Sequence, residues 1–162
     1  MGDPMRHLSV KGLVRLKEME GVEKRVYPDA SGYDTIGVGH LLTKDERASG
    51  KITIGNHQVK YEEGLTDDEV YALLRQDLKH VEWAVESGVK VELTQDQFDC
   101  LICFVFNIGV SAFLNSTLRR KLNNGQYAEV PMELRRWVYS AGKKFPGLER
   151  RREKEIELWE RG

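Results

Sequence analysis

The sequence predicts an α+β fold that is mostly helical, with a small antiparallel β-sheet lobe and a larger helical lobe. Apolar residues recur at helical spacing from residue 66 onward, whereas the segment 26–64 combines turn signals with short stretches of alternating polarity. The 162 residues, 40% of them hydrophobic, suit one domain without repeats or long linkers. We therefore expect a single domain over 1–162, with a β-containing lobe at about 22–65, a helical lobe at about 66–162 that includes the N-terminal helix, and a functional cleft between the lobes.

Composition excludes several classes of protein. Lys and Arg number 25 and Asp and Glu 26, so a net charge of −1 argues against a strongly basic nucleic-acid binder. Two cysteines, Cys100 and Cys103, build neither a disulfide scaffold nor a four-cysteine zinc site, and we expect buried thiols. No stretch reaches the roughly 18 apolar residues of a membrane span. The N-terminal residues lack the apolar core of a secretion signal, so we expect a chain made in the cytoplasm.

The N-terminal half predicts one helix followed by short strands. Ser9 is a plausible N-cap for an amphipathic helix that ends at Glu20, because Gly21 follows as a stop signal. A turn over 28–32 precedes an alternating strand over 33–39. A second hairpin is expected from strands at 52–54 and 59–61, joined through Gly55-Asn56.

The C-terminal half predicts a helical bundle. Capping boxes at 66–69 and 94–97 begin two helices, and the second is apolar nearly all round over 98–106, which indicates a buried central helix. A short helix is expected from Ser116 or Thr117 to Asn124-Gly125. A further helix is expected from Pro131 to Ala141, and a loop over 142–147 precedes a last helix that ends near Trp159.

Three polar residues gather where the first helix meets the sheet. Glycosidic hydrolysis needs one protonated carboxyl to assist the leaving oxygen and one ionised carboxylate. The negative end of a helix dipole favours the acid role for Glu20, whereas Asp29 in the turn suits activation of a water that Thr35 holds. Taken alone, Glu20 is also one of several surface acids and Asp29 a common turn former, so residue types leave the catalytic interpretation open.

Charged residues on two apolar helix faces call for partners. Asp77 lies at helical spacing with buried positions, and His40 shares strand parity with Ile36, which favours a His40–Asp77 pair that stabilises the fold. Arg152 falls on an apolar face of the last helix and needs a carboxylate, for which Glu20 is one candidate. Arg151 is the alternative if the helix is rotated slightly. The segment 135–161 contains a small excess of basic residues, which favours attraction to an anionic polymer.

Several strings together resemble the tailed-phage lysozymes of the T-even type, the endolysins of glycoside hydrolase family 24. Glu20-Gly21, Tyr27-Pro28-Asp29 and the run Gly-Tyr-Asp-Thr-Ile-Gly-Val-Gly-His over 32–40 carry the resemblance in the catalytic stretch. Further matching segments extend it over about 12–160: Leu93-Thr94-Gln95, Phe106-Asn107-Ile108-Gly109, Ser116-Thr117-Leu118-Arg119, Arg136-Trp137, Gly147-Leu148 and Arg151-Arg152. Residues 133–136 do not align cleanly with the substrate-contact region of the T-even type.

The resemblance implies a lysozyme-like fold and hydrolysis of the β-1,4 bond between N-acetylmuramic acid and N-acetylglucosamine in peptidoglycan, with inversion at the anomeric carbon and lysis of the host cell. By it, Glu20 is the general acid, Asp29 activates or stabilises, and Thr35 orients the water. It implies further site residues, which are Leu41, Phe106, Asn107 and Thr117 as substrate contacts and His40, Asp77, Arg151 and Arg152 as structural support. No metal or cofactor is expected. Glycan strands are the expected partner, reached by a monomer that passes from the host cytoplasm to the wall through a holin.

Three alternatives stay open. A lytic transglycosylase would use Glu20 alone and form an anhydro-sugar, although Asp29 and Thr35 argue for water as the nucleophile. A catalytically dead wall-binding or regulatory module would tolerate loss of Glu20. Nucleic-acid binding through Arg150-Arg151-Arg152 is the third and requires steeply salt-dependent affinity.

Overall fold

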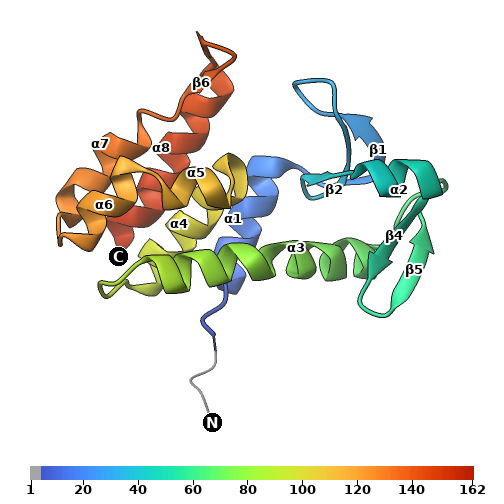
Figure 1. Cartoon of the computed structure of the whole chain (residues 1–162), viewed down its shortest axis with the longest axis horizontal. Helices are drawn as coiled ribbons and strands as arrows, with labels where there is room; N and C mark the ends of the chain where they lie inside the picture. Colours follow the sequence, from blue (N-terminus) through green and yellow to red (C-terminus); the bar gives the residue numbers. More distant parts are fainter. Residues whose placement is uncertain (1–4) are drawn as a thin grey trace. The chain divides into compact units, whose positions relative to one another are not determined.

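The computed structural model describes residues 5–162, and its chain divides into two compact units. One unit comprises residues 14–79, and the other comprises residues 1–13 together with 80–162. The divisions fall inside two helices, α1 (Val10–Glu20) and α3 (Asp67–Gly88) (Figure 1). We call these parts the sheet unit and the helical unit.

The sheet unit holds two small antiparallel sheets, as the alternating polarity predicts. Strands β1 (Glu23–Pro28), β2 (Asp34–Gly37) and β3 (His40–Leu41) form the first sheet in that order. Strands β4 (Lys51–Ile54) and β5 (His57–Lys60) form the second, and Gly55-Asn56 makes its turn (Figure 1).

The core of the sheet unit uses both faces of β2. Ile36 and Val38 are buried as predicted, but Thr35 and Gly37 are buried too. The strand ends at Gly37, so His40 begins β3 opposite Ile36 instead of extending the same strand. Thr35 therefore does not face solvent, although it is polar; its hydroxyl is buried.

A short helix, α2 (Lys44–Ser49), lies between the two sheets in the chain and is missing from the sequence prediction. It starts with a complete capping box between Thr43 and Glu46 and ends at Gly50, which has φ 73°. None of its six residues is buried, so it has no apolar periodicity that could have revealed it.

The helical unit is organised around α4 (Gln95–Ile108), which begins at the predicted capping box of Thr94 and Gln97. Its run from Phe98 to Val105 is buried, including both free cysteines, as expected. It packs against α8 (Pro146–Arg161), which starts at Pro146, inside the segment expected to be a loop. The unit also contains α5 (Val110–Leu114), α6 (Thr117–Asn123), the 3-10 turn η1 (Tyr127–Glu129) and α7 (Val130–Leu134) (Figure 1).

The helix predicted to start at Pro131 is present, with Pro131 in its first turn, but its predicted extension to Ala141 is wrong, because α7 ends at Leu134. Strands β6 (Tyr139–Ser140) and β7 (Lys143–Lys144) pair instead. Ala141 and Gly142 have φ values of 51° and 79°, the two left-handed residues of a tight hairpin turn. Apolar residues at helical spacing suggested a helix here, but Ala141 and Gly142 form a hairpin turn instead.

Candidate active site

Glu20 is the last residue of α1, where the helix stops at a glycine. The Gly21 N–H donates to the Lys17 carbonyl oxygen over 2.8 Å. Gly21 has φ 78°, a left-handed conformation that residues with a Cβ rarely adopt. The chain then enters β1, and the half-buried Glu20 lies at the junction of helix and sheet, as expected from the sequence.

Asp29 is held in the turn between β1 and β2 by backbone donors. Its Oδ1 accepts hydrogen bonds from the N–H groups of Ser31 at 2.9 Å and Tyr33 at 2.8 Å. Its own N–H donates to the Tyr33 carbonyl oxygen at 2.9 Å, which closes the turn. Among residues 5–162, Oδ2 of Asp29 has no hydrogen-bond donor, so this oxygen is available to a water.

Thr35 lies on β2, which pairs with β1 on one side and β3 on the other. Its side chain is buried, at 4% exposure, and its Oγ1 donates to the Tyr33 carbonyl oxygen at 2.9 Å. Because the hydroxyl proton is used in this bond, the hydroxyl oxygen keeps its lone pairs for a donor such as water. Thr35 lies opposite Tyr27 on β1 and opposite Leu41 on β3.

The carboxylates of Glu20 and Asp29 both lie near the side chain of Tyr27. Burial raises the pKa of its phenol, and the negative charges of Glu20, Glu23 and Asp29 raise it further. Glu20 and Asp29 therefore both act on the same phenol, and Thr35 lies opposite that residue in the strand register. Glu20 and Asp29 thus both lie near Tyr27, and Thr35 is its partner on the neighbouring strand. Tyr27 belongs to a string that carries the family resemblance, but its position beside both carboxylates follows only from the strand register.

The predicted substrate contacts fall in both units. Leu41 lies on β3 of the sheet unit with 53% of its surface exposed, so its side chain is accessible to a ligand. Phe106, Asn107 and Thr117 belong to the helical unit. Asn107 accepts a hydrogen bond at Oδ1 from the Arg152 guanidinium. Joint contact of all four residues with one glycan strand stays a prediction.

Thr117 lines a surface hollow of about 480 Å³ in the helical unit. The hollow also contains a buried carboxylate, Glu133, which pairs with Lys121 at 3.0 Å and Arg136 at 3.4 Å. Its other lining residues are Ala112, Asn115, Ser116 and Trp137. The polar side chains among these residues can bind hydroxyl and amide groups of a sugar.

Arg151 and Arg152 both bind a carboxylate that the sequence analysis did not consider. Glu155, on the same helix, is fully buried and accepts from Arg152 Nη1 at 2.5 Å and from Arg151 Nε at 3.1 Å. Arg152 also donates to the Trp137 carbonyl oxygen at 2.8 Å, and Arg151 to that of Cys103 at 2.8 Å. The alternatives Arg151 and Arg152 are therefore both buried. A pairing of Arg152 with Glu20 would join the two units and stays a prediction.

His40 is the centre of an ionic cluster in the sheet unit. The expected partner is present, because His40 Nδ1 lies 2.7 Å from Asp77 Oδ2. A second carboxylate was missed: His40 Nε2 lies 2.9 Å from Oε1 of Glu46, which also caps α2 at Thr43. Burial opposes the charge on His40, but the bonds to Asp77 and Glu46 outweigh it and raise the pKa to about 9.

We expect this cluster to make stability depend on pH. Because the folded pKa of His40, about 9, lies above the ordinary histidine value of 6.5, the stabilisation is complete below about pH 6.5 and is lost as pH rises through about 9. Allowing for partial solvent exposure, the loss is on the order of 2–3 kcal/mol in the free energy of unfolding. Denaturant unfolding of the wild type and His40→Gln at pH 6 and pH 10 measures it.

The difference between the two proteins isolates His40, because other groups titrate in both. We expect the wild-type advantage over His40→Gln to be large at pH 6 and to shrink at pH 10. An advantage of equal size at both pH values would show that the charge on His40 contributes nothing.

Among residues 5–162, no group of three or more His, Cys, Asp or Glu side chains is placed to hold a metal ion. None of the helices described has both the length and the apolar character needed to cross a bilayer.

Several known proteins are similar to this chain over nearly their whole length. The endolysin of Salmonella phage P22 is 39% identical over 155 residues, covering 96% of this chain and 99% of that protein. The endolysin of Acyrthosiphon pisum secondary endosymbiont phage 1 is 35% identical over 158 residues, covering 95% and 98%. The solved muramidase domain of SpmX from Asticaccaulis excentricus superposes with a TM-score of 0.74 at 31% identity, covering 95% and 97%.

The fold and the family are those of a lysozyme-type glycoside hydrolase. Residues 17–155, most of the chain, match the family described as Phage lysozyme. The protein belongs to the phage lysozyme family.

Proposed function

We propose that the protein hydrolyses the β-1,4 bond between N-acetylmuramic acid and N-acetylglucosamine by an inverting acid–base mechanism. Its family and its endolysin and muramidase relatives make peptidoglycan the substrate and lysis of the bacterial cell the outcome. The finer assignment of bond, stereochemistry and residue roles rests on the arrangement of Glu20, Asp29 and Thr35.

In this mechanism Glu20 donates its proton to the departing glycosidic oxygen. Asp29 accepts a proton from a water that attacks the anomeric carbon from the opposite face of the sugar. One proton enters the leaving sugar and one leaves the water, so the hydrolysis is balanced. Inversion requires the two carboxyls to stand roughly 6.5–9.5 Å apart, with the water between them.

The observation that carries the proposal is the way Asp29 is bound. Two backbone N–H groups fix its Oδ1, while Oδ2 has no hydrogen-bond donor in the described part of the chain. The carboxylate is therefore rigid yet keeps one oxygen for water. Thr35 supplies a second acceptor on the neighbouring strand, which supports its role in orienting that water.

Replacing Asp29 with asparagine tests the base. The amide keeps a carbonyl oxygen for the backbone donors but cannot take a proton, so we expect lysis of permeabilised Gram-negative cells to fall by roughly 10²-fold. Asp34→Asn is the matched control, because Asp34 is exposed at the start of β2 and has no role in the mechanism. Equal rates for both variants would remove Asp29 from the mechanism.

Access to the wall is a separate part of the proposal. By the family resemblance, a monomer accumulates in the host cytoplasm and reaches peptidoglycan when a holin permeabilises the inner membrane. Inducible expression in a Gram-negative host should leave cells intact until a holin is co-expressed. Rapid lysis without a holin would contradict this route.

A further inference from the structure

Tyr27, Thr35 and Leu41 form a row across the first sheet. In the pairing of β1 with β2, Tyr27 lies opposite Thr35, and in the pairing of β2 with β3, Thr35 lies opposite Leu41. Residues directly opposite each other in antiparallel strands project on the same face of the sheet, with their Cβ atoms about 4.5–5.5 Å apart. The side chain of Tyr27 is therefore an immediate neighbour of the Thr35 side chain.

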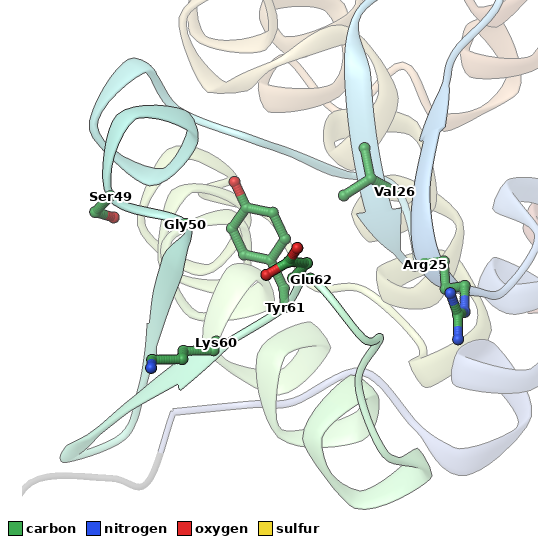
Figure 2. Close-up of a pocket in the computed structure, with 7 residues that line it drawn as sticks. All are labelled: Arg25, Val26, Ser49, Gly50, Lys60, Tyr61 and Glu62. Atoms are coloured by element: carbon green, nitrogen blue, oxygen red, sulfur yellow. The ribbon is translucent and has the colours of Figure 1, made fainter.

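The strand that carries Tyr27 is irregular just before this residue. Between Glu23 and Tyr27, four residue steps along β1 match only two steps along β2. Within this stretch the Lys24 carbonyl oxygen accepts from the Leu65 N–H at 2.8 Å, and residues 25–26 border a hollow of about 640 Å³ (Figure 2). Irregular pairing of this kind re-aims a side chain and is common beside active sites. Regular pairing resumes at Tyr27.

The hydroxyl of Tyr27 is available as a proton donor. Within residues 5–162 it makes no hydrogen bond, in contrast to the hydroxyl of Tyr61, which donates to the Glu46 carbonyl oxygen at 2.8 Å. No fully buried polar side-chain atom of the described chain lacks a hydrogen bond, so the hydroxyl of the half-buried Tyr27 reaches solvent. A water at the site can therefore accept a hydrogen bond from it.

The charges around Tyr27 keep its phenol protonated. Burial raises the pKa of the phenol, and the carboxylates of Glu20, Glu23 and Asp29 raise it further, because a phenolate would lie among like charges. The ordinary pKa of a tyrosine is already about 10. Tyr27 therefore stays a neutral donor over the pH range in which a pair of carboxyl groups acts as acid and base.

The proposed position of the attacking water, between Asp29 and Thr35, offers that water acceptors only. An ionised Asp29 cannot donate, and the proton of the Thr35 hydroxyl is engaged with the Tyr33 carbonyl oxygen at 2.9 Å. A water held by both residues directs its two protons toward them. One of its lone pairs attacks the anomeric carbon, and the other can accept a hydrogen bond from a neutral donor beside Thr35.

We propose that Tyr27 is a fourth residue of the active site, whose hydroxyl donates a hydrogen bond to the attacking water. This role rests on the proposed function, because it concerns the same water. Asp29 still takes the proton of the water and Tyr27 keeps its own, so the hydrolysis stays balanced. Two hydrogen bonds leave a water free to rotate about the line that joins its partners, whereas a third fixes its attacking lone pair.

Tyr27→Phe keeps the ring and removes the donor. We expect kcat on a peptidoglycan oligomer to fall about tenfold, the effect of one hydrogen bond, with KM unchanged because the bond is made to water and not to the glycan. Tyr71→Phe is the matched control, because Tyr71 is an exposed tyrosine of the same unit whose hydroxyl also makes no hydrogen bond within residues 5–162. Equal kcat for both variants, or a raised KM with unchanged kcat, would overturn the proposal.

A double-mutant cycle with Asp29→Asn separates this role from a purely structural one. If both residues act on one water, adding Tyr27→Phe to Asp29→Asn should lower kcat by less than about twofold, far below its cost in the wild type. The full tenfold cost in both backgrounds would overturn the proposal. Failure of the proposed function is distinguishable, because Asp29→Asn alone would then keep the wild-type rate.

The pH profile of kcat gives a second readout that a structural role would not provide. Because Tyr27 is neutral on both limbs of the profile, Tyr27→Phe should lower kcat by the same factor at every pH and leave both limbs in place. A shifted limb would mean that Tyr27 acts on the ionisation of Glu20 or Asp29 and not on the water, which would overturn the proposal.

Discussion

Replacing Glu20 with glutamine is expected to reduce the lysis rate by roughly 10²–10⁴-fold while wall binding is retained. Glutamine has nearly the same shape and keeps the hydrogen-bonding capacity of the side chain, but it has no proton of suitable acidity for the departing oxygen. Turbidity loss of permeabilised Gram-negative cells measures the rate, and co-sedimentation with purified walls measures binding.

Glu18→Gln is the matched control, because Glu18 lies one half-turn earlier on α1 with 55% of its side chain exposed. We expect near wild-type lysis from it. If Glu20→Gln lyses cells as fast as Glu18→Gln, Glu20 is not the acid. A wall-binding or regulatory module would then be the better description.

Glu155→Gln is expected to destabilise the fold by about 3–5 kcal/mol, the cost of breaking a buried ion pair. Glu155 is fully buried and neutralises two guanidinium groups that are themselves buried. Without its charge, Arg151 and Arg152 repel each other in a medium that screens poorly. Chemical denaturation, followed by circular dichroism, measures the change in the free energy of unfolding.

Glu153, two residues earlier on the same helix, provides the control. It pairs with Arg135 at 2.8 Å, but its side chain is 56% exposed, so solvent already screens the charges. Glu153→Gln should change stability little. Similar losses from both substitutions would contradict the account of Glu155 as the centre of a buried network.

The candidate catalytic residues were accessible to sequence reasoning because each depends on local chain features. Glycine after Glu20 ends the helix, Asp29 closes its own turn, and Thr35 follows in a short strand. All three lie within 16 residues of one another in the printed sequence. The relation of Tyr27 to Glu20 and Asp29 was not predicted, because it depends on strand register and burial.

The ionic networks were harder to predict, because they depend on which charged residue faces inward. Glu155 lies in a run dense with Glu and Arg, and only the tertiary packing of α8 on α4 selects it for burial. Glu46 carried a readable capping box with Thr43, but its second role depends on the position of His40. The helix expected through Ala141 failed because periodicity was given more weight than a two-residue turn.

The anomeric configuration of the first product tests the central claim most directly. Proton NMR can follow the newly formed reducing end of a peptidoglycan oligomer before mutarotation scrambles it. Attack by water opposite the leaving group predicts the α-anomer as the initial product. A β-anomer would indicate a retaining route, and a 1,6-anhydro end would indicate transglycosylation; either result would contradict the roles given to Asp29 and Thr35.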